Sequence, residues 1–138
     1  MSEDLVLLEL NARWNCDLPF GWAPITRPLK ASEEAEIYQA TSFHKRFGST
    51  IRQLVAETFD ISAMFEITEG GAVAFNRLEK CVFCYDGLEY LYTDAAFRFL
   101  IYFSHEESIT IGGKLLLNRI RIAWPDYKNH LWDDYRLH

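Results

Sequence analysis

Apolar and polar positions in the first half of the chain predict one strand followed by two helices. Residues 5–10 form a short, nearly continuous apolar run, as expected for a buried strand. Residues 17–30 contain all but one of the prolines and are expected to form a loop. Segment 32–43 opens with a serine and two glutamates, which is typical of a helix N-cap and acidic first turn. Residues 49–59 carry apolar side chains at three- and four-residue spacing and predict a second helix.

The second half of the chain predicts strands and one final helix. In 97–103, every second residue from Phe97 to Phe103 is Phe or Ile. Leu100 and Tyr102 make the other face apolar too, so we expect a central strand covered on both sides. Apolar residues four apart in 114–124 predict a helix that ends before a proline. The predicted strands are 64–68, 82–85, 88–92, 97–103 and 108–111.

These elements predict an α+β fold, with two N-terminal helices packed on a mainly antiparallel sheet and a C-terminal helix. The 138 residues suffice for one domain, 1–138, that buries its own core. An apolar fraction of 49% and an aromatic fraction of 15% exclude a disordered chain.

The net charge of the chain limits the kinds of partner that we expect it to bind. The formal net charge is −6 and the pI is about 5.2, which disfavours nucleic acid and anionic membrane surfaces and favours a basic protein. Residues 1–4 are acidic where a signal peptide is basic, and no apolar stretch is long enough to span a membrane. With three cysteines, an odd number, we expect a cytoplasmic protein with reduced thiols.

The Cys81-x-x-Cys84 pair and the Gly112-Gly113-Lys114 segment are the first two candidates for chemistry. Within the predicted strand, Cys81 and Cys84 project to opposite faces, and no second cysteine pair completes a zinc site. Gly112-Gly113-Lys114 resembles an anion-binding helix start but lacks the remaining residues of a P-loop. We therefore expect ordinary thiols, a tight corner at the glycines, and neither metal nor cofactor.

Ser104-His105-Glu106 is the third candidate. Adjacent residues cannot converge as a catalytic triad, so the simplest interpretation is a hydrogen-bonded turn. A His and a Glu at a hairpin tip could also perform acid–base chemistry or contact a partner. The residues we expect at a partner-binding surface are His105, Glu106, Glu107, Trp132, Asp133 and Asp134.

Residues 97–126, which include the Ser-His-Glu tip and Trp124-Pro125-Asp126, resemble the final third of certain small bacterial proteins. Several of those proteins are assigned to the immunity proteins of polymorphic and contact-dependent toxin systems. The resemblance implies a cytoplasmic, non-enzymatic inhibitor that covers a toxin domain. It carries over no specific contact residue.

Three hypotheses follow. The first is an immunity-type module whose acidic surface, with aromatic anchors among the carboxylates, binds a cognate toxin such as a nuclease. The second is a small enzyme centred on His105 and Glu106, which requires a concave pocket around both side chains. The third is a non-catalytic homodimer with a structural or regulatory role. The first requires folding to gather scattered acids and exposed rings on one surface.

Overall fold

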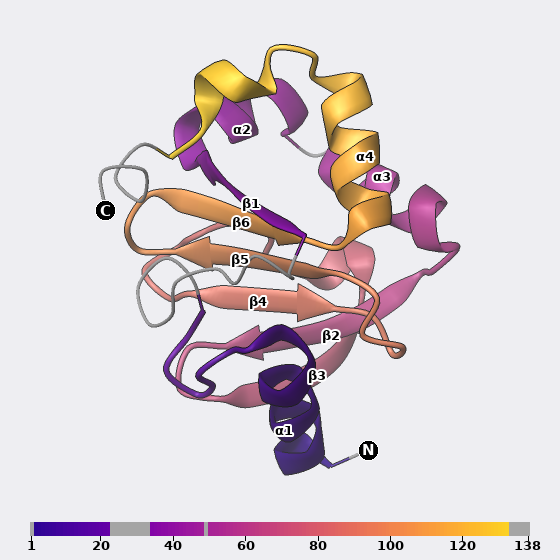
Figure 1. Cartoon of the computed structure of the whole chain (residues 1–138). Helices are drawn as coiled ribbons and strands as arrows, with labels where there is room; N and C mark the ends of the chain where they lie inside the picture. Colours follow the sequence, from indigo (N-terminus) through magenta and orange to yellow (C-terminus); the bar gives the residue numbers. More distant parts are fainter. Residues whose placement is uncertain (1, 23–33, 49, 133–138) are drawn as a thin grey trace.

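A computed structural model describes residues 2–22, 34–48 and 50–132, which form four α-helices and a six-stranded sheet (Figure 1). The α-helices are α1 (Glu3–Trp14), α2 (Ala40–Phe47), α3 (Thr50–Phe59) and α4 (Lys114–Ala123). The strands are β1 (Ala35–Gln39), β2 (Ala63–Thr68), β3 (Ala72–Arg77), β4 (Tyr90–Thr93), β5 (Leu100–Ser104) and β6 (Ser108–Gly112). Short 3₁₀ helices cover Leu78–Lys80 and Tyr127–His130. The predicted α+β class is confirmed.

All neighbouring strands in the sheet are antiparallel, and their order is β1-β6-β5-β4-β2-β3. Tyr90 at the start of β4 lies opposite both Thr68 and Phe103, and Ser104 lies opposite Ser108. The β2–β3 turn, the start of β4 and the β5–β6 turn therefore lie at one end of the sheet. Figure 1 shows this end at the left, where β5 turns into β6.

The sheet has a buried core on each face, because its interior strands carry apolar side chains in both directions. One core packs Ile101 and Phe103 against α2, α3 and α4. The other packs Leu100 and Tyr102 against α1 and its following loop. Figure 1 shows α1 standing apart from the other three helices. The prediction of a central strand covered on both sides is confirmed, since all five residues of β5 are buried.

The prediction of a strand at residues 5–10 is wrong, because they belong to α1. Ser2 caps this helix by accepting a hydrogen bond from the Leu5 amide at 3.3 Å. Val6 and Leu10, one helical turn apart, are fully buried against the sheet, whereas Leu5 and Leu8 are exposed. The two exposed leucines hide the helical period and make the segment resemble a buried strand.

Of the helix predicted at 32–43, the structure describes residues 34–43, and the prediction is wrong for most of them. Residues 35–39 form the edge strand β1, and α2 begins only at Ala40. Residues 32 and 33, with the proposed serine cap, lie outside the described residues. The predicted helices at 49–59 and 114–124 are confirmed as α3 and α4, apart from a boundary residue or two.

Two strand predictions require correction in the second half. Residues 82–85 form a loop in which Phe83 has a φ of 57°, so the return strand β4 has no hairpin partner there. Phe97 also has a left-handed φ of 57° and precedes β5. It packs on the α1 side, opposite to Phe99, so the two do not share a face. In the described ranges, no helix is long and apolar enough to cross a bilayer.

Candidate functional site: the acidic end of the sheet

Four chain segments meet at the end of the sheet where β5 turns into β6. We call this surface the acidic end, and it consists of loop 17–21, turn 68–71, loop 84–89 and turn 104–108. Pairing of β2, β4, β5 and β6 fixes the last three. Loop 17–21 joins them because Pro19 lines a small cavity together with Glu69 and Glu89.

Every segment of the acidic end contributes a carboxylate, and none contains Lys or Arg. Three large apolar side chains are also exposed there: Phe20 at 73%, Tyr85 at 45% and Leu88 at 43%. Large apolar side chains exposed beside polar residues are a feature of candidate protein-binding surfaces. The carboxylates are Asp17, Glu69, Asp86, Glu89, Glu106 and Glu107.

The opposite end of the sheet carries cations. Arg13, Arg98 and Lys114 line a cleft of about 430 Å³ beyond the ends of β4 and β6. Arg13 and Arg98 are each paired with a carboxylate at 2.5 Å, from Glu9 and Asp94 respectively. Glu34 lines the same cleft, so carboxylates balance the cations there, whereas the segments of the acidic end hold carboxylates without Lys or Arg.

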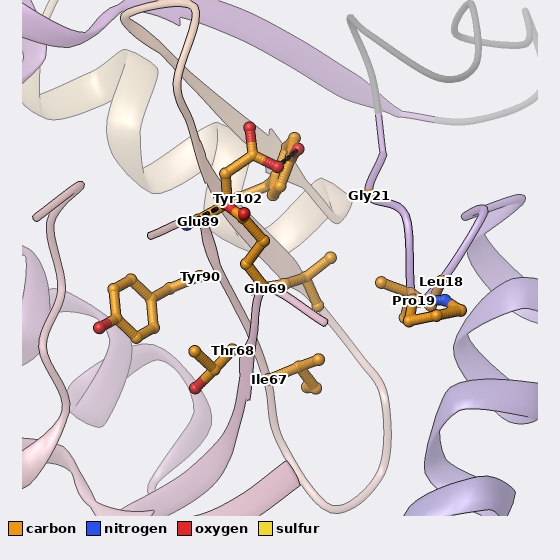
Figure 2. A pocket seen from close by; sticks show the side chains of 10 residues that line it. Leu18, Pro19, Gly21, Ile67, Thr68, Glu69, Glu89, Tyr90 and Tyr102 are labelled. Atoms are coloured by element: carbon orange, nitrogen blue, oxygen red, sulfur yellow. Dashed lines mark hydrogen bonds between the residues drawn. The ribbon is translucent and has the colours of Figure 1, made fainter. Parts of the chain in front are cut away.

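Glu89 organises the centre of the acidic end. Its carboxylate is 6% exposed and accepts three hydrogen bonds. The Tyr102 hydroxyl donates to Oε1 at 2.6 Å, and the His105 backbone N–H and Nδ1 donate to Oε2 at 2.9 and 2.6 Å. Figure 2 shows Tyr102 and Glu89 joined by a dashed line. These bonds tie β4 to β5 and hold the β5–β6 turn in one orientation.

Loop 17–21 closes over this network. Gly21 has a φ of 137°, and a Cβ there would lie 2.8 Å from the Tyr102 hydroxyl oxygen, so only glycine fits. The cavity between this loop and Glu69 is about 10 Å³, which is the size of one water molecule and too small for a substrate (Figure 2). Burial raises the pKa of Tyr102, and its hydrogen bond to Glu89 raises it further.

The hydrogen bond to Glu89 fixes the orientation of the His105 ring. Because Nδ1 donates to Glu89, Nε2 is the ring nitrogen that faces away from this carboxylate. The side chain is 55% exposed at the tip of a turn. The carboxylate that orients His105 is Glu89, which is distant in sequence, and not that of the neighbouring Glu106.

The structure brings most of the predicted partner-binding residues together. His105, Glu106 and Glu107 form the β5–β6 turn, and the Trp132 indole N–H donates to the Glu106 carbonyl at 3.2 Å. Trp132 is half-buried against the core on the α1 side. Asp133 and Asp134 lie outside the described residues.

Sequence reasoning missed other residues of this surface, because they come from distant segments. Phe20, Tyr85 and Leu88 lie in loops with no regular period, and Glu89 becomes a neighbour of His105 only through the pairing of Tyr90 with Phe103. A register assigned to β4 and β5 in the sequence would have revealed the Glu89–His105 contact.

A second buried carboxylate has a structural role. Glu66 is 7% exposed and accepts hydrogen bonds from the Tyr92 hydroxyl at 2.6 Å and the Val82 amide at 2.8 Å. Arg52 donates to the carbonyls of Cys81 and Val82 from the other side. This network fixes loop 81–84 against the sheet.

The cysteines show no reactive arrangement. The prediction that Cys81 and Cys84 lie in a strand is wrong, since both are in a loop, and both are free thiols. Burial raises the pKa of the Cys81 thiol to about 12, and its Sγ lies 3.6 Å from the Arg77 carbonyl. Across the described ranges, no group of three His, Cys, Asp or Glu side chains could hold a metal ion.

A cleft of about 300 Å³ opens beside the acidic end, between α2 and loop 84–89. His44 from α2 stacks on Phe103 with ring centroids 5.9 Å apart, and Glu107 lines the same cleft. Burial lowers the pKa of His44, so this ring is neutral at physiological pH.

Comparison with known proteins gives no match: no family model, no curated protein and no solved structure is similar to this chain.

Proposed function

We propose that this chain is a non-enzymatic, immunity-type binding module that neutralises a cationic toxin domain by covering it with the acidic end. One observation carries the proposal: the folded chain brings carboxylates from four segments to one end of the sheet, where three large apolar side chains are also exposed. We place the protein in the cytoplasm, consistent with its three free cysteines.

The charge distribution supports fast and oriented association. Carboxylates concentrated at one end, with no Lys or Arg in the four segments that form it, would turn that end toward a basic surface before contact. Such steering raises association rates and suppresses binding in the reverse orientation. A nuclease domain, whose substrate-binding surface is necessarily basic, is the kind of toxin that this field would attract.

The exposed apolar side chains would supply binding energy that charge alone does not supply. Phe20, Tyr85 and Leu88 lie in loops that are anchored by the sheet, so little conformational entropy is lost when a partner covers them. Apolar and aromatic side chains at the centre of an interface contribute most of its binding energy. The surrounding carboxylates would form its polar rim.

The geometry favours binding over catalysis. An enzyme centred on His105 and Glu106 requires a pocket around both side chains, yet His105 projects from the tip of a turn and is oriented by a carboxylate in the wall of a water-sized cavity. The Glu89–His105 pair therefore presents an imidazole ring of fixed orientation to a partner surface.

The test is co-production with the protein encoded immediately upstream of this chain. We expect that protein to carry a toxin domain, to form a 1:1 complex with this chain, and to stop cell growth only when the chain is omitted. A 1:1 complex measured by light scattering, together with restored growth, supports the proposal. An upstream gene that encodes no toxin, or a toxin that is neither bound nor neutralised, contradicts it.

A further inference from the structure

The cleft beside the acidic end combines buried polar atoms with aromatic rings. Phe103, Ser104 and Ser108 are almost fully buried and form its inner surface. Tyr85 and Glu107 are exposed and form its rim. The cleft is therefore apolar inside, with hydroxyl groups within and a carboxylate at its mouth.

The lining of the cleft favours a cation with a flat, apolar surface. No Lys or Arg is among the described residues that line it, and its only basic side chain, His44, is kept neutral by burial. A guanidinium group stacks on aromatic rings such as Tyr85 and His44 and pairs with a carboxylate through two parallel hydrogen bonds.

The serine pair supplies a further acceptor. Ser104 and Ser108 Oγ atoms lie 2.8 Å apart and share one hydrogen bond, and Ser104 Oγ also accepts from the Glu106 amide at 3.0 Å. A hydroxyl oxygen has two lone pairs, so Ser108 Oγ retains one that can accept from a ligand in the cleft.

We propose that this cleft receives one arginine side chain of the basic partner. The inference rests on the proposed function and adds a specific anchor to it. The aliphatic part of the side chain would cover Phe103, and the guanidinium would reach Glu107 at the rim. The volume of about 300 Å³ lies at the lower end of the range of ligand pockets, which fits a single side chain better than a cofactor.

The test uses a blocked Gly-Arg-Gly peptide and its counterpart with citrulline, the neutral isostere of arginine. Amide chemical shifts of the isotope-labelled chain are followed during titration with each peptide. We expect the arginine peptide to shift the amides of Ala40, Ser104 and Ile109, and the citrulline peptide to shift them much less. Glu107→Gln should weaken the arginine peptide about two- to fivefold, whereas Glu106→Gln, on the same turn but outside the cleft, should not.

Cys84 allows the cleft to be blocked chemically. This thiol is half-exposed and lines the cleft, whereas Cys16 and Cys81 are 2% and 3% exposed. Alkylation with N-ethylmaleimide should abolish the arginine-dependent shifts, and Cys84→Ser treated in the same way should retain them.

Three results would overturn the inference: no shifts with either peptide, equal shifts with both, or shifts that survive alkylation of Cys84. Its failure is separable from failure of the proposed function. A toxin complex that forms normally with the Glu107→Gln chain and with the alkylated chain removes the arginine cleft alone. Arginine binding without any toxin complex removes the immunity function alone.

Discussion

Replacement of Glu89 by Gln tests whether the buried carboxylate holds the acidic end in shape. Three donors, from the Tyr102 hydroxyl and two groups of His105, face its two oxygens. Gln keeps the shape but is uncharged, so its carbonyl oxygen accepts from His105 without the charge of the carboxylate, and its NH₂ group faces the Tyr102 hydroxyl, whose hydrogen bond must reverse. Hydrogen bonds to a charged group contribute about 1.5–3 kcal/mol each. Because His105 is half-exposed and water can replace part of its contact, we expect a loss of about 2–4 kcal/mol in the free energy of unfolding.

Urea unfolding followed by tryptophan fluorescence measures this loss. With an m value of about 2 kcal/mol/M, the midpoint should fall by about 1–2 M while m stays constant. Glu107→Gln is the matched control, since its carboxylate is exposed and the loss should stay within about 0.5 kcal/mol. If Glu89→Gln unfolds at the same midpoint as this control, the Glu89 network does not stabilise the fold.

Three further predictions concern the same surface and core. Gly21→Ala should lower the free energy of unfolding by about 1–3 kcal/mol in urea titration. The loss should be larger than for Gly87→Ala, because an added Cβ at Gly87, whose φ is 106°, is strained but meets no atom within 4 Å. Phe20→Ala should leave the unfolding midpoint unchanged but weaken toxin binding by at least about 1 kcal/mol in calorimetry, because the ring is exposed. Burial raises the pKa of the phenols in the folded state, so above pH 10 only the unfolded chain releases these protons. The free energy of unfolding should therefore keep its full value below pH 10. Above pH 10 it should fall by about 1.4 kcal/mol per pH unit for each buried phenol. Tyr92→Phe should therefore reduce this alkaline slope, and a slope unchanged by it would contradict the assignment. The buried phenols are Tyr38, Tyr92 and Tyr102.

The elements with a strong local period could be predicted from the sequence. In α3, Ile51 and Val55 lie one turn apart and are buried, and β5 has apolar residues on both faces. In α1, by contrast, Leu5 and Leu8 are exposed, so hydrophobicity does not follow one side of the helix. The short strand β1 is determined by its pairing with β6, which no local signal reveals.

The site was predictable only where its residues are adjacent in the chain. The turn from His105 to Glu107 was identified, together with its neighbour Trp132. Glu89 and Phe20 were not, because strand register and loop closure bring them there. The proposed binding surface therefore depends on these long-range pairings more than on any motif.

The most direct measurement compares the association rates of two charge-reversed chains with the toxin domain over a range of ionic strengths. One chain carries Glu69→Lys and Glu106→Lys at the acidic end, and the other carries Glu34→Lys and Glu57→Lys elsewhere, so both have the same net charge. If the acidic end is the interface, the first chain should associate about tenfold or more slowly at low salt and lose most of its salt dependence, while the second stays close to the unmodified chain. Equal rates for the two chains would show that the toxin does not recognise this surface.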